Sequence, residues 1–227
     1  MTLPRRIHAL VGHQISRWEA AGRPVWVPPC IAIASLPGAG GEELGRIVAD
    51  RLGYGLFDRE IVDEVARRRG VSEELLRGLD GRMRTLIDRY VSDFRRTRSI
   101  AETEFVNEVI RTVTTIGQRG LAVIVGRGSA FILDPHVALR VGVVAPVAVR
   151  VERFAKQKGM ERRQAESVLH QEDERRAQYI RHAFHARIDD PLHYDLMLNT
   201  GAMDLDAAAS LVVETLHIRF PRTRRGS

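Results

Sequence analysis

The stretch "CIAIASLPGAGGEEL", residues 30–44, joins an apolar run to an amphipathic segment through a glycine-rich turn. The run at 30–35 carries no charge, which is typical of a strand buried on both faces of a parallel sheet. The segment at 41–52 has apolar residues at helical spacing, namely Leu44, Ile47, Val48 and Leu52. The stretch therefore predicts a strand, a turn and a helix in succession, which is the unit of α/β folds.

The glycine-rich turn has the composition of a phosphate-binding loop, whose usual pattern is G-x-x-x-x-G-K-[ST]. With Gly40 aligned on the second glycine, Ser35 replaces the first glycine, Gly41 replaces the lysine and Glu42 replaces Ser or Thr. Glycines still let backbone N–H groups face an anion, and a helix N-terminus adds partial positive charge. The predicted phosphate-binding residues are Gly38, Ala39, Gly40, Gly41, Glu42 and Glu43.

The carboxylate of Glu42 has three possible roles. Together with Glu43, it lies in the predicted first helical turn, where acidic residues interact favourably with the helix dipole. It also stands at the Ser/Thr position of the pattern, where a carboxylate oxygen would ligate Mg²⁺. Its negative charge would alternatively oppose phosphate and disable the loop. The sequence leaves these roles open.

Further apolar runs alternate with helical segments along the chain. Together with 30–35, strands are expected near 54–57, 121–126, 138–144 and 194–198, all parallel. A charged helical block at 72–118 interrupts this alternation and is interpreted as an inserted lobe. The expected organisation is a helical extension and linker at 1–28, one α/β domain at 29–219, and a basic tail at 220–227 without regular structure.

The composition narrows the classes of ligand and compartment. A net charge of +6, almost all from arginine, suits phosphate-bearing ligands, whereas 6% aromatic residues make nucleic acid an unlikely partner. A single cysteine, Cys30, fits a reducing compartment. No apolar stretch approaches the ~20 residues of a membrane span, so we expect no membrane association and a cytoplasmic location. The oligomeric state is left open.

Four later motifs follow in a recognisable order: "AVIVGRGSAFIL", "LRVGVVAPVAVRVERF", "QEDERRAQYI" and "DPLHYDLMLNT". With the first stretch, they resemble the cytidylate kinase-like family of P-loop nucleoside monophosphate kinases over residues 30–216. The resemblance implies a three-layer P-loop kinase fold with a five-stranded parallel sheet, a helical lobe and an arginine-rich lid at 161–190. It also implies nucleotide substrates, with ATP as phosphoryl donor, CMP or dCMP as acceptor, and Mg²⁺ bound mainly through the nucleotide.

A second reading is a nucleotide-binding sensor or partner-binding module with weak or lost kinase activity. The branch of the family with a divergent loop carries arginine where this chain has Ser35 and Glu42. The better-known cytidylate kinases also have an aspartate where this chain has Gly128, so the acceptor base is left open.

The resemblance assigns roles to individual residues. Arg127, in "VGRGS", would contact the acceptor and contribute to catalysis. Asp58 and Arg59 begin the helix that binds the monophosphate, although Asp58 equally fits a helix N-cap. Asn199 and Thr200 would either line the base site or form a turn.

The lid assignment rests on a D-x-x-R-x-x-Y spacing. Asp173, Arg176 and Tyr179 match it, with Arg175 and Arg181 nearby. Arg175 and Arg176 are assigned to catalysis with Arg127, because guanidinium groups bind phosphate oxygens bidentately as charge spreads in phosphoryl transfer. We expect the lid to move more than the core, because it is rich in arginine and short of apolar anchors.

Overall fold

The structure is a computed structural model that describes residues 27–67, 85 and 100–226. Its centre is a sheet of five parallel strands in the order β2-β3-β1-β4-β5. The strands are β1 (Cys30–Ser35), β2 (Gly55–Phe57), β3 (Ala122–Val125), β4 (Ala138–Val144) and β5 (Leu196–Asn199). All five predicted strands are therefore confirmed, each within two residues of its expected ends.

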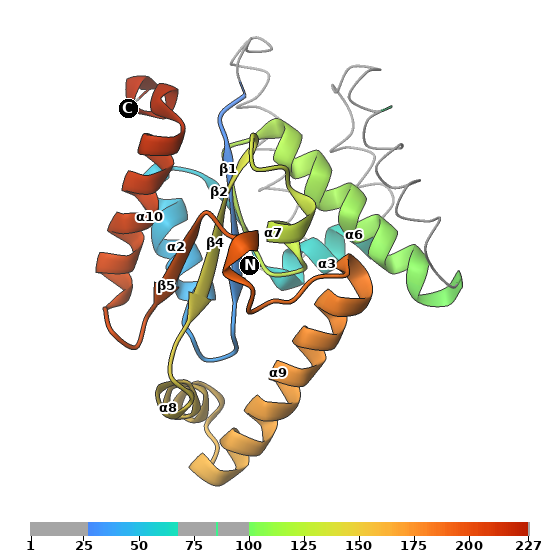
Figure 1. The fold of residues 1–227 in the computed structure, drawn as a ribbon, viewed down its shortest axis with the longest axis vertical. Helices are drawn as coiled ribbons and strands as arrows, with labels where there is room; N and C mark the ends of the chain where they lie inside the picture. Colours follow the sequence, from blue (N-terminus) through green and yellow to red (C-terminus); the bar gives the residue numbers. More distant parts are fainter. Residues whose placement is uncertain (1–26, 68–84, 86–99, 227) are drawn as a thin grey trace.

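Helices cover both faces of the sheet, which confirms the three predicted layers (Figure 1). On one face lie α2 (Gly41–Leu52) and α10 (Leu205–Arg219), which pack on an apolar cluster that includes Ile31, Leu44 and Val212. On the other lie α3 (Arg59–Arg67), α6 (Ile100–Arg119) and the short α7 (Ser129–Ile132).

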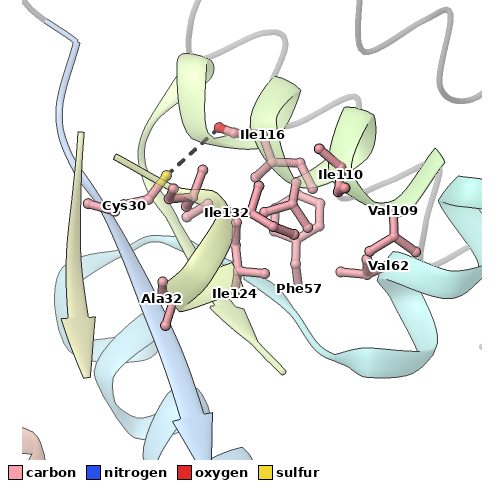
Figure 2. Close-up of a cluster of buried hydrophobic side chains, with 14 of the residues drawn as sticks. Cys30, Ala32, Phe57, Val62, Val109, Ile110, Ile116, Ile124 and Ile132 are labelled. Atoms are coloured by element: carbon pink, nitrogen blue, oxygen red, sulfur yellow. Dashed lines mark hydrogen bonds between the residues drawn. The ribbon is translucent and has the colours of Figure 1, made fainter. Parts of the chain in front are cut away.

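The second face buries a cluster of side chains drawn in Figure 2. Phe57 from β2 and Ile124 from β3 are fully buried against Val62 of α3 and Ile116 of α6. Burial of each such side chain contributes about 1.5–3 kcal/mol. Burial also raises the pKa of the Cys30 thiol to about 12, so this cysteine acts as a core residue.

Two helices lie at the carboxyl edge of the sheet, at the bottom of Figure 1. These are α8 (Val147–Lys158) and α9 (Arg162–Phe184), and the latter confirms the charged helix expected in the lid. The expected lack of apolar anchors is wrong, because Ala165 and Leu169 of α9 are buried against Val151 and Phe154 of α8. The greater mobility of 161–190 stays a prediction.

A partly buried ion pair joins β4 to the start of β5, which pairs with Val141–Val144 in the second half of β4. Asp195, which precedes β5, accepts hydrogen bonds from the backbone N–H and the guanidinium of Arg140, the latter at 2.9 and 3.2 Å. Arg219 of α10 lies 3.3 Å away on the same carboxylate. Burial opposes ionisation of Asp195, but the bonds from Arg140 outweigh it and hold the pKa of that carboxyl below its ordinary value.

Some expected segments fall outside the described residues. These are most of the extension at 1–28 and, in the block at 72–118, residues 72–84 and 86–99. The described remainder of that block belongs chiefly to α6. The tail at 220–227 was expected to lack regular structure, and this is wrong, because Pro221–Gly226 forms a 3₁₀ helix that continues from α10.

Candidate phosphate-binding site

The glycine-rich turn connects the carboxyl end of β1 to α2, as predicted. Gly38 and Gly40 have φ angles of +74° and +83°, which residues other than glycine rarely adopt. A Cβ at Gly38 would also lie 2.5 Å from the carbonyl oxygen of Arg150, and one at Gly41 would lie 2.3 Å from Cβ of Ser35. The turn therefore needs glycine for two reasons, namely its backbone conformation and its tight packing against neighbouring segments.

The amino end of α2 has backbone N–H groups that form no hydrogen bond within the helix. Its first helical hydrogen bond runs from the Leu44 N–H to the Gly40 carbonyl, and no side chain in the described part of the chain caps the helix. The N–H groups of Gly41, Glu42 and Glu43 therefore have no acceptor within the helix. Such an array of donors, with the positive end of the helix dipole behind it, is suited to an anion.

Two carbonyl groups of the turn are bound by side chains from other parts of the chain. The guanidinium of Arg150 donates to the Pro37 carbonyl at 3.3 Å, and the hydroxyl of Thr200 donates to the Ala39 carbonyl at 2.8 Å. Arg153 holds Thr200 in turn, with bonds of 3.0 Å to its hydroxyl and 2.8 Å to its carbonyl. Because these bonds fix two of its carbonyls, they favour one conformation of the turn.

Sequence reasoning missed Arg150 and Arg153. They lie one helical turn apart in "APVAVRVERF", directly after β4, and that position was the available signal. Thr200 is buried and supports the turn, whereas the side chain of Asn199 accepts the Gly201 N–H and so forms a local turn.

One of the predicted arginines contacts the segment that leads into the turn. Arg176 of α9 donates to the backbone carbonyl of Ser35, the last residue of β1. Burial, together with the nearby positive charge of Arg59, lowers the pKa of Arg176, while the carboxylates of Glu42 and two other acids oppose this. Arg59 and Glu42 are therefore close enough to Arg176 to influence its charge, and the site roles of all three residues stay predictions.

The other predicted lid residues lie in different surroundings. Asp173 binds Arg150 through both carboxylate oxygens at 2.9 Å. Arg175 pairs with Glu172 at 3.1 Å and is 63% exposed, so it points away from the turn. The ring of Tyr179 packs edge-on against Phe184, with centroids 5.8 Å apart.

Arg181 lines an open groove of about 540 Å³ between α9 and the segment that follows it. The groove begins at Leu36, next to the turn, and Asp173 and Asp189 are also among its lining residues. Arg181 is exposed and is therefore available to a ligand that extends from the turn along α9.

Arg127 occupies the turn after β3 with a φ of +52°. Its guanidinium pairs with Asp63 of α3 and lies 5.7 Å from the ring centroid of Phe105. The Arg127 Nε and one oxygen of Asp63 are buried, and neither has a hydrogen-bond partner among the residues that the structure describes. Asp58 accepts a hydrogen bond from the Ile61 N–H at 2.9 Å. This is the geometry of a helix N-cap, one of the two roles that the sequence allowed for Asp58.

The two acidic residues of the first turn of α2 are exposed. Glu43 binds Arg46 on the outer face of the helix, and this hydrogen bond lowers the pKa of its carboxyl. Among the described residues, no group of three His, Cys, Asp or Glu side chains is placed to hold a metal ion.

The profile of the cytidylate kinase-like family matches residues 30–202, which include the glycine-rich turn, Arg127 and all of α9. The chain belongs to this family. Among solved structures, an uncharacterized protein from Eubacterium ventriosum has the same fold, with a TM-score of 0.67 and 19% identity, over 83% of this chain and 97% of that one.

A shikimate kinase from Bacteroides thetaiotaomicron is a more distant structural match, with a TM-score of 0.49 and 14% identity, over 83% of this chain and 98% of that chain. A curated uronate isomerase from Corynebacterium glutamicum is 32% identical over 100 residues, which are 44% of this chain. The match spans only 19% of that isomerase. In the described part of this cytidylate kinase-like chain, no helix is long and apolar enough to cross a membrane.

Proposed function

We propose that this member of the cytidylate kinase-like family binds ATP at the glycine-rich turn and transfers its γ-phosphoryl group to a nucleoside monophosphate, CMP or dCMP by family resemblance. The observation that carries this proposal is the turn itself. Among the described residues, no side chain caps the amides at Gly41, Glu42 and Glu43, while the Pro37 and Ala39 carbonyls are already bound by Arg150 and Thr200. A loop so fixed presents donors, and not acceptors, to the phosphates.

The missing lysine of the usual loop has a candidate replacement. Arg176 reaches the turn from α9, with Arg59 close enough to affect its pKa. In phosphoryl transfer the protein mainly positions the reactants and neutralises charge on the transferred group. Arg176 would exchange the Ser35 carbonyl for phosphate oxygens, and Arg59 would neutralise charge beside it.

Mg²⁺ fits this site as an ion carried by the nucleotide. Glu42 is exposed at the amino end of α2 and would hold it together with the phosphates. When bound, Mg²⁺ supplies charge neutralisation across the phosphate oxygens. The role of Glu42 as a ligand stays a prediction.

A nucleotide-binding protein without turnover is the second candidate, and a specific contact favours it. Arg127, assigned to the acceptor, already pairs with Asp63, so its charge is partly satisfied before any acceptor binds. An acceptor monophosphate would have to compete with that carboxylate for the guanidinium.

Steady-state formation of ADP, measured with ATP and CMP, dCMP, UMP or AMP, tests the proposal. Arg176→Ala should lower the rate about 100-fold or more, because it removes the cation at the turn. Arg175→Ala is the matched control, since this neighbouring side chain is largely exposed and bound to Glu172.

The control should retain the rate within about threefold. Acceptor-dependent ADP formation that Arg176→Ala abolishes would support the kinase. Calorimetric binding of ATP without turnover on any acceptor would favour the second candidate, and absence of ATP binding would refute both.

A further inference from the structure

Arg150 of α8 contacts three separate segments with one side chain. It is 4% exposed, and it donates to the Ala145 carbonyl at 3.1 Å and to the Pro37 carbonyl at 3.3 Å. It also binds both carboxylate oxygens of Asp173 at 2.9 Å. These partners belong to the residue after β4, the glycine-rich turn and α9, so a single guanidinium joins the turn to α9.

The main chain of Arg150 supports the same turn. A Cβ at Gly38 would lie 2.5 Å from the Arg150 carbonyl oxygen, so the turn rests directly on the backbone of α8. A second contact between α9 and the turn lies three residues beyond Asp173, where Arg176 donates to the Ser35 carbonyl. Residues three apart share a helix face, so this face of α9 is held at two points, to Arg150 through Asp173 and to the end of β1 through Arg176.

We infer that Arg150 is a positioning residue that couples α9 to the phosphate-binding turn, so that an anion on the turn and the docked α9 stabilise each other. The charge of Asp173 compensates a nearly buried guanidinium, and its removal would leave that charge without a carboxylate partner. The planar fork of arginine meets carbonyl and carboxylate groups in fixed directions, whereas lysine is a point charge. Coupling between two sites is reciprocal, so it is measurable from either side.

The inference rests on the proposed function only in taking the anion to be the phosphates of a nucleotide. The probe is therefore inorganic pyrophosphate. Amide hydrogen exchange measures the protection of each segment, and calorimetry measures the affinity for pyrophosphate. In the wild type, pyrophosphate should slow exchange both in the turn, residues 36–43, and in α9 around 173–180.

Asp173→Asn breaks the charge pair at nearly constant volume. We expect faster exchange in α9 and in the turn together, and a loss of pyrophosphate affinity of about 5- to 150-fold, the usual range for coupled sites. Pyrophosphate should then protect the turn but no longer α9. Glu174→Gln is the matched control, because Glu174 lies on the same helix, is exposed and contacts only His170 among its described charged partners, at 3.4 Å. It should behave as the wild type.

Arg150→Lys provides a second variant that keeps the charge and removes the fork. It should loosen the turn and α9 together and lower pyrophosphate affinity, even where the unfolding temperature is close to that of the wild type. The inference is overturned if Asp173→Asn frees α9 while exchange in the turn and affinity are unchanged, or if Arg150→Lys behaves as the wild type. Failure of the wild type to bind pyrophosphate would refute the proposed function, and the joint exchange response of Asp173→Asn would still decide the coupling.

Discussion

Gly38→Ala tests whether the turn is held by contact with α8. Gly38 has a φ of +74°, in the left-handed region. A residue with a Cβ loses about 1–2 kcal/mol when it adopts this conformation. The added Cβ would also lie 2.5 Å from the Arg150 carbonyl oxygen, and overpacking of this kind costs about 1–3 kcal/mol. The expected loss in unfolding free energy is therefore roughly 2–5 kcal/mol, with the turn displaced.

Gly159→Ala isolates the steric part of this loss. Gly159 has a φ of +63° at the end of α8, and a Cβ there would meet no atom within 4 Å. This variant should lose about 1–2 kcal/mol, or roughly 2–8 °C in unfolding temperature, and keep its ATP affinity. Gly38→Ala should lose more by thermal unfolding and bind ATP at least tenfold more weakly by calorimetry. Equal stability and equal affinity in the two variants would refute the reasoning.

Three further predictions concern single carboxylates. Glu42→Arg should tighten the binding of metal-free ATP by at least tenfold in calorimetry, because charges a few ångströms apart near a surface interact by a few kcal/mol. Weaker binding that is confined to Mg·ATP would identify Glu42 as a metal ligand. Unchanged affinity for both metal-free ATP and Mg·ATP would remove Glu42 from the site. Asp195→Asn should lower the unfolding free energy by roughly 2–3 kcal/mol at pH 7. Because the pKa of Asp195 is lowered in the folded state, the wild type should lose this advantage as the pH falls below about 4. Chemical denaturation across pH 2–7 would contradict this if the unfolding free energies of the two proteins changed in parallel with pH. Asp58→Ala should cost about 0.5–2 kcal/mol in thermal unfolding through the lost cap, with unchanged CMP affinity, and a selective loss of CMP affinity would favour the substrate role instead.

The layered α/β architecture was predictable because it depends on local patterns. The uncharged run at 30–35 has to be buried on both faces, and the helical periodicity at 41–52 has to face the sheet. The glycines of the turn were equally readable, since few other residues adopt the backbone conformation of Gly38 and Gly40. Glu42 and Glu43 are exposed in the first turn of α2. Their exposure was predictable from their spacing relative to the apolar residues of the same helix.

The support of the site depended on contacts between distant residues. Thr200 bonds to Ala39 from 161 positions away, and Arg150 bonds to Pro37 from 113 positions away. No local pattern encodes such pairs, because they form only after the strands have brought their carboxyl edges together.

Adjacent arginines show the same limit. Arg175 and Arg176 are neighbours in the sequence and were both assigned to catalysis, yet about 100° of helical rotation separates their side chains. Arg176 therefore contacts Ser35, while Arg175 lies in solvent beside Glu172. The sequence by itself determined the sheet, the turn and the sign of the charges around it. Only tertiary packing decided which charges reach the turn, because that depends on how α8 and α9 rotate when they dock.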